Sequence, residues 1–119
     1  MAFPATYNIS YYKGDTYEFR IYPKDSSGAA FDLTDYADED IVFSISTSRG
    51  TTPTIEAYAI KSDDETYIQC AILPANGAAM TAGTTYVYDV EISRSASPYD
   101  YVFTLMTGNI SVTDQVTGA

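Results

Sequence analysis

The sequence predicts an all-β protein, a β-sandwich of seven to nine short antiparallel strands with one short helical crossover. Three observations predict this class. Apolar and polar residues alternate with a period of two through most of the chain, and no segment keeps a helical period. The chain contains 12 tyrosines and many serines and threonines, which favour strands and turns. Turn residues recur at the intervals that are typical of the short strands of a β-sandwich. A small closed barrel is the alternative architecture.

In the first half of the chain, each strand is predicted from one apolar row and the turn that follows it. Turn signals lie at residues 13–15, 23–28 and 48–53, and residues 35–40 form an acidic loop. The weakly alternating segment 54–61 predicts an edge strand. The apolar rows are Tyr7, Ile9 and Tyr11; Tyr17, Phe19 and Ile21; Phe31 and Leu33; and Ile41, Phe43 and Ile45.

The second half repeats this pattern. Pro74 opens the one predicted helix, over residues 74–80, and Gly108 is expected to bend the chain before a last short strand. Tyr86 begins its strand just after the crossover, where its hydroxyl is expected to bond to the upstream backbone as a tyrosine corner; an ordinary half-buried strand tyrosine is the alternative. The apolar rows are Ile68, Cys70 and Ile72; Tyr86, Tyr88, Val90 and Ile92; Tyr101, Phe103 and Leu105; and Ile110 and Val112.

The length of the chain indicates how many domains it forms, and its net charge disfavours certain classes of partner. The 119 residues fit a single domain, 1–119, with an N-terminal arm (1–6) and a C-terminal tail (114–119). The net charge of −10 disfavours nucleic acid and anionic membranes as partners. The first residues lack the features of a secretory signal, and no apolar run is long enough to span a bilayer. We therefore expect a protein that is used without export through the secretory route.

Few residues could carry catalysis. The chain has no histidine, and its one cysteine, Cys70, alternates with isoleucines as a buried thiol would. We therefore expect no enzyme, no catalytic residues and no cofactor. The acidic groups at residues 35–40 and 63–65 offer oxygen ligands for calcium but lack the spacing of a calcium loop, so solvated acidic loops are the favoured interpretation and no metal site is predicted.

The predicted functional residues are those of a protein interface. Phe3 and Pro4 lie in the N-terminal arm, and four tyrosines fall on the outward rows of strands: Tyr12, Tyr22, Tyr58 and Tyr67. Exposed tyrosines are enriched at protein–protein interfaces. The first strand, residues 7–12, is expected to help by pairing at a sheet edge. The alternative is that the outward tyrosines stack on sugars, as in a host-glycan-binding adhesion module.

Four sequence blocks carry a resemblance to a known family. They are YKGDTY (residues 12–17), KDSSG with FDLT (24–28 and 31–34), TAGTTYVYDVEI (81–92) and GNISV (108–112). In order and spacing they resemble the small immunoglobulin-like virion proteins of tailed bacteriophages, which are related to the N-terminal domain of baseplate upper proteins. The chain departs from that pattern by an extra threonine before Tyr86 and by ending soon after its last strand.

The resemblance implies an immunoglobulin-like sandwich that serves as a structural subunit of the virion, assembled in the host cytoplasm. Its partners would be other virion proteins of the tail, baseplate, neck or capsid, and it would be oligomeric in the particle. The two departures favour a single-domain accessory subunit over a whole baseplate upper protein. A capsid decoration protein is the first alternative. A domain of a larger bacterial surface protein is another, which the initiator methionine disfavours.

Overall fold

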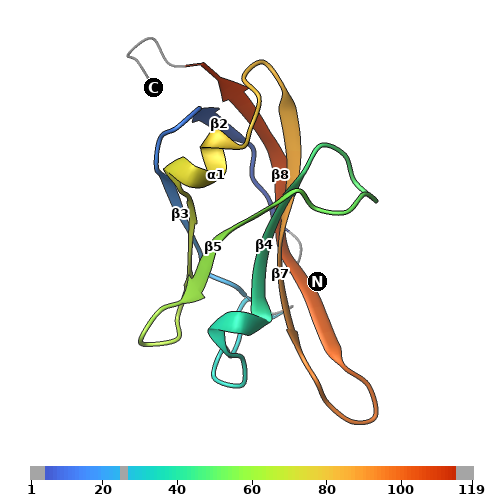
Figure 1. Cartoon of the computed structure of the whole chain (residues 1–119). Helices are drawn as coiled ribbons and strands as arrows, with labels where there is room; N and C mark the ends of the chain where they lie inside the picture. Colours follow the sequence, from blue (N-terminus) through green and yellow to red (C-terminus); the bar gives the residue numbers. More distant parts are fainter. Residues whose placement is uncertain (1–4, 25–26, 115–119) are drawn as a thin grey trace.

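The structure is a computed structural model that describes residues 5–24 and 27–114 (Figure 1). It is mostly β-strand with one short helix, so the predicted all-β class is confirmed. The elements in chain order are β1 (Ala5–Thr6), β2 (Ile9–Tyr12), β3 (Tyr17–Ile21), the 3-10 turn η1 (Asp38–Asp40), β4 (Ile41–Ser46), β5 (Ile55–Lys61), β6 (Ile68–Ile72), α1 (Pro74–Ala78), β7 (Thr85–Arg94) and β8 (Tyr101–Thr113).

The strands form one mixed sheet in the order β1-β8-β7-β4-β5-β6-β3, with β2 also paired to β8. Strands β1 and β2 run parallel to β8, and the other pairs are antiparallel. The prediction of a purely antiparallel arrangement is therefore wrong at the N-terminus. Alternation specifies which face of a strand is apolar, but it does not specify the direction of the neighbouring strand.

Strand β5 joins the two halves of the sheet instead of lying at an edge. Its first residues pair with β4, and residues from Tyr58 to Lys61 pair with β6. The prediction of an edge strand over residues 54–61 is therefore wrong. The alternation is weak because Ala57 and Ala59, which pack against the core, are small. We infer that these small side chains let the sheet curl sharply here.

The last two predicted strands are one strand, β8, which continues without a break through Gly108. Gly108 does not bend the chain. A Cβ atom on Gly108 would lie 2.1 Å from the carbonyl oxygen of Tyr7, so glycine is needed for the close approach of the N-terminal segment. This contact holds the chain between β1 and β2 against β8.

The sheet curls until its ends face one another. Phe19 on β3 contacts Phe43 on β4 and Tyr88 on β7, with ring centroids 5.6 and 6.2 Å apart, although these strands are distant in the strand order. The predicted inward rows of β4, β6 and β7 are buried, which confirms them. Six residues of the predicted inward rows differ. Tyr7 is exposed, and the other five are only partly buried: Tyr17, Phe19, Phe31, Tyr101 and Phe103.

The predicted tyrosine corner is present. The Tyr86 hydroxyl accepts a hydrogen bond of 2.8 Å from the backbone N–H of Thr81, five residues upstream. The crossover before it contains α1, as predicted, and Gly77 of this helix lies against the hydroxyl end of the Tyr11 side chain. The bond fixes the path of the chain from the helix into β7.

Candidate functional site

Three of the predicted interface residues come together on one outer face. Tyr22 follows β3, Tyr67 precedes β6, and Tyr58 lies on β5, opposite Ala71 of β6. Tyr12 lies on β2, beside β8, and is not part of this group. Phe3 and Pro4 lie outside the described residues. The structure therefore assembles half of the predicted set.

A compact cluster marks the centre of this face. The rings of Tyr22 and Tyr67 have centroids 5.4 Å apart, and the guanidinium carbon of Arg20 lies 4.3 Å from the centroid of Tyr67. Arg20 also donates to the Gln69 side-chain oxygen (3.1 Å) and to the Tyr22 hydroxyl (3.5 Å). The cation–π contact and the hydrogen bonds pre-order long side chains that would otherwise lose entropy on binding.

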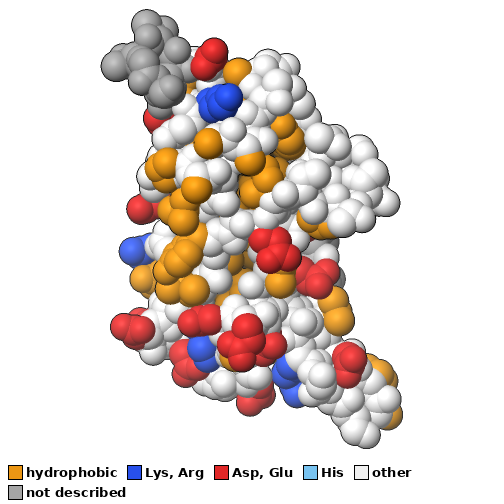
Figure 2. All heavy atoms as spheres, viewed as in Figure 1, with side chains coloured by type: hydrophobic (Ala, Val, Ile, Leu, Met, Phe, Trp, Pro, Cys, Tyr) orange, Lys and Arg blue, Asp and Glu red, His pale blue; other side chains and the backbone are white. Residues whose placement is uncertain are grey.

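The apolar character of the face extends beyond the cluster. Tyr22 and Tyr58 are 54% and 41% exposed, and Leu73, just after β6, is 40% exposed. Figure 2 shows apolar side chains gathered on the side of the molecule where β3 and β5 lie, and acidic side chains more numerous towards the end that carries η1. We call this surface the tyrosine face; its members are Arg20, Tyr22, Tyr58, Ile60, Tyr67, Gln69 and Leu73.

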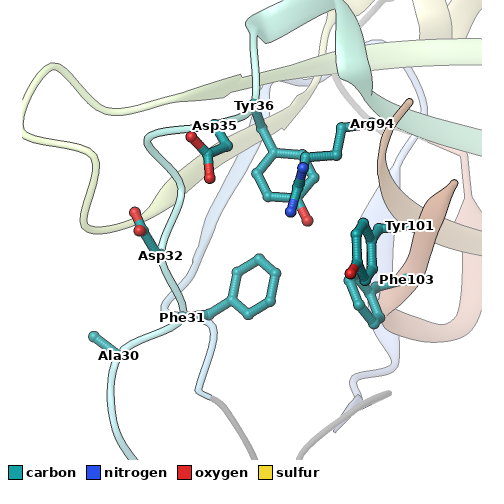
Figure 3. Close-up of a pocket in the computed structure, with 8 residues that line it drawn as sticks. All are labelled: Ala30, Phe31, Asp32, Asp35, Tyr36, Arg94, Tyr101 and Phe103. Atoms are coloured by element: carbon teal, nitrogen blue, oxygen red, sulfur yellow. The ribbon is translucent and has the colours of Figure 1, made fainter. Parts of the chain in front are cut away.

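A second feature is a pocket of about 380 Å³ between the loop before η1 and the hairpin that joins β7 to β8 (Figure 3). We call it the aromatic pocket; its lining residues are Ala30, Phe31, Asp32, Asp35, Tyr36, Arg94, Tyr101 and Phe103. Residues 31–34 were expected to be a short extended piece, and in the structure they form an irregular loop. Leu33 of that loop is fully buried, which anchors the pocket wall.

Aromatic rings surround one guanidinium in this pocket. The guanidinium carbon of Arg94 lies 4.5 Å from the ring centroid of Tyr101 and 5.8 Å from that of Tyr36. The rings of Tyr101 and Phe103 stack with centroids 6.3 Å apart, and Tyr99 packs edge-on against Tyr101. Figure 3 shows Asp32 and Asp35 on the opposite side of the pocket from Tyr101.

The polar groups of the pocket are unevenly paired. Asp32 accepts from the Thr34 N–H (2.9 Å) and hydroxyl (2.7 Å) through a single oxygen, and these bonds hold the pKa of its carboxyl below the usual value. The Nε atom of Arg94 is buried, and within the part of the chain that the structure describes it has no hydrogen-bond partner. The pocket therefore combines carboxylate acceptors with the guanidinium of Arg94.

Sequence reasoning did not single out the aromatic pocket. Tyr36 lies in the predicted acidic loop 35–40 and is 5% exposed, and Arg94 ends β7. The one sequence feature that marks this site is that Asp32 and Asp35 lie within six residues of one another together with Phe31 and Tyr36. This feature indicates a loop that carries both acidic and aromatic side chains, but it does not identify the hairpin that packs against the loop.

The chemical inventory of the described residues is limited. Cys70 is buried, and burial raises the pKa of its thiol to about 12, so the thiolate needed for nucleophilic attack is not populated at neutral pH. Across residues 5–24 and 27–114, no three acidic or cysteine side chains gather as a metal site would require. Asp38 and Asp40 of the acidic loop instead accept hydrogen bonds from the backbone N–H groups of Lys61 and Ala37.

Neither a model of a known protein family nor a curated protein sequence matches this chain. Among the helices of the described residues, none has the length and apolar character needed to cross a bilayer.

Proposed function

We propose that this protein is a structural subunit of a tailed-bacteriophage virion, an accessory protein of the tail, baseplate or neck. It would act by docking on other virion proteins rather than by catalysis. The observation that carries the proposal is the tyrosine face, which presents pre-ordered aromatic side chains around Arg20 on a rigid sheet. Tyrosine and arginine are the side chains most enriched among residues that dominate binding energy.

The strand pairing supports an immunoglobulin-like sandwich. Strands β8, β7 and β4 are neighbours in the same order as strands G, F and C of that fold. Strands β3 and β6 are neighbours, as strands B and E are. The Tyr86 corner stands at the start of β7, where strand F would carry it. These features agree with the resemblance of the sequence to phage virion proteins.

The N-terminal strands provide the second proposed contact. β1 and β2 pair with β8 on one side, and among the described strands nothing pairs with their other side. A strand of a neighbouring subunit could add to this edge through backbone hydrogen bonds. Phe3 and Pro4 directly precede this edge in the sequence, so the arm would reach the same partner.

Charge defines the complementary surface. The chain carries a net charge of −10, so the docking partner should present basic groups around the contact, and association should weaken as salt is added. The same charge disfavours nucleic acid and membrane surfaces as partners. The protein would be present in several copies in the particle, within the virion assembled in the host cytoplasm.

Capsid decoration is the alternative role, and copy number separates the two. Quantitative mass spectrometry of purified particles should find this chain at a fixed low multiple of three or six per particle. Hundreds of copies would indicate a decoration protein. Absence from intact purified particles would contradict both roles.

A further inference from the structure

We propose that the aromatic pocket is a binding site for a neutral pyranose sugar. This inference goes beyond the docking role, because the pocket lies between the loop before η1 and the β7–β8 hairpin, whereas the tyrosine face is formed by β3, β5 and β6. It also differs from the sugar-stacking alternative drawn from the sequence, because none of Tyr12, Tyr22, Tyr58 or Tyr67 lines it.

The size and lining of the pocket suit a small ring. Its volume of about 380 Å³ falls within the range of small-molecule sites, roughly 300–1,000 Å³. Tyr101 and Phe103, whose ring planes lie 23° from parallel, provide an apolar wall on one side of the pocket. One face of a pyranose carries mainly C–H groups, which can pack on such a wall as other apolar groups do.

The polar groups of the pocket favour a neutral sugar over a charged ligand. Asp32 and Asp35 supply acceptors on one side of the pocket, and Arg94 supplies N–H donors on the other (Figure 3). Sugar hydroxyls both donate and accept, so one ring can satisfy both sides. A cation such as a quaternary ammonium would meet Arg94, and an anion would meet two carboxylates, so each charged class faces repulsion that a neutral ring does not.

Arg94 gives the strongest indication that the pocket is prepared for a polar ligand. Its guanidinium is held over Tyr101, and among the residues that the structure describes its buried Nε atom has no hydrogen-bond partner. A buried donor without a partner is costly. A bound hydroxyl would supply an acceptor to the terminal nitrogens of this group, and the tyrosine rings already fix its orientation.

The test is a nuclear magnetic resonance titration of the full ¹⁵N-labelled chain with D-glucose, D-galactose and N-acetyl-D-glucosamine, and with choline and D-glucuronate as charged probes. We expect at least one neutral sugar to shift amide signals of residues 30–36 and 94–103. Asp35→Asn and Tyr101→Ala should each weaken that binding by at least about tenfold, the loss of one good contact. Tyr58→Ala, on the tyrosine face, should leave it unchanged.

Three outcomes would overturn the proposal: no neutral sugar binds, the shifts lie outside the pocket, or choline or glucuronate binds more tightly than every neutral sugar. Asp35→Asn keeps the test valid if Tyr101→Ala unfolds the hairpin, because the Asp35 side chain lies at the pocket surface and can be changed without removing an aromatic ring. The dispersion of the amide spectrum of each variant shows directly whether it is folded.

Discussion

The Tyr86 hydroxyl accepts a hydrogen bond of 2.8 Å from the backbone N–H of Thr81, and this bond fastens the helical crossover to the start of β7. Tyr86 is 5% exposed, so its ring is fixed by the core while its hydroxyl restrains the loop. The contact links the two parts of the fold that meet at α1, namely β6 and β7.

Removing this hydroxyl should weaken the fold without altering it. Tyr86→Phe deletes one hydrogen bond and leaves the Thr81 N–H to water, so the free energy of unfolding should fall by about 1 kcal/mol, the usual net value of such a bond. Urea denaturation followed by circular dichroism measures the change. Tyr58→Phe removes an exposed hydroxyl and should have no effect. Equal stability of the Tyr86 variant and the native chain would show that the corner does not restrain the crossover.

The contact of Phe43 with Phe19 is expected to be the most sensitive point of the core. Phe43 is fully buried, and its ring meets Phe19 from the opposite half of the sheet. Phe43→Ala should lower the free energy of unfolding by about 3–5 kcal/mol, the usual cost of truncating a buried phenylalanine. Val102→Ala, at a position that is 56% exposed, is the control. A loss well under 1 kcal/mol for Phe43→Ala would mean that the halves do not pack as described.

The approach of the N-terminal segment to β8 should not tolerate a side chain at Gly108. In Gly108→Ala the new Cβ would overlap the Tyr7 carbonyl oxygen, so the segment between β1 and β2 must move away from β8. We expect a loss of about 1–3 kcal/mol, typical of overpacking. Hydrogen exchange should show faster exchange at Tyr7, whose N–H bonds to the Thr107 carbonyl. Unchanged protection of that amide would contradict the close approach.

Alkaline pH should destabilise the protein. Burial raises the pKa of the Cys70 thiol to about 12, and burial and a hydrogen bond shared with the Tyr7 hydroxyl raise that of Tyr17 to about 12. In the unfolded chain such groups ionise near about 8.5 and 10. The unfolded state therefore releases these protons first, so the stability that the two groups contribute is constant below about pH 8.5 and falls as pH rises towards 12.

Urea midpoints measured from pH 7.5 to pH 11 test this dependence. The midpoint should fall progressively above about pH 8.5, and Cys70→Ala should reduce the fall between pH 8.5 and 10. A midpoint that stays level to pH 11 would show that these groups are not protected by the fold.

The tyrosine face should matter for incorporation into particles but not for folding. Tyr67→Ala removes the ring that holds Arg20 and Tyr22 in place, so it should lower the amount of this chain in purified particles several-fold. Tyr99→Ala removes an exposed tyrosine of the β7–β8 hairpin, outside both proposed contacts, and should be incorporated normally. The reverse result would place the contact on the hairpin.

The N-terminal arm needs a truncation that spares the sheet. Deleting residues 1–6 would also remove β1, whose residues pair with Met106 and Thr107 of β8. Deleting residues 1–4 leaves that pairing intact. The shorter deletion should keep the stability of the fold and reduce incorporation.

Particular residues show how far the sequence predicts this structure. The rows of Phe43, Cys70 and Val90 were predicted because a period of two identifies the buried face of each strand directly. Their pairing partners were not, because β5 divides its hydrogen bonds between β4 and β6, and only the curled sheet brings Arg94 and Tyr101 beside Tyr36. The aromatic pocket depends on contacts between distant segments, which local alternation does not encode.

A cryo-electron microscopy reconstruction of the intact particle tests the central claim most directly. We expect density for this fold at a fixed position in the tail, baseplate or neck, with Tyr22, Tyr58 and Tyr67 buried against a neighbouring virion protein and the acidic end exposed. A reconstruction that resolves every protein of the particle and shows the tyrosine face exposed to solvent, or the fold absent, would contradict the account.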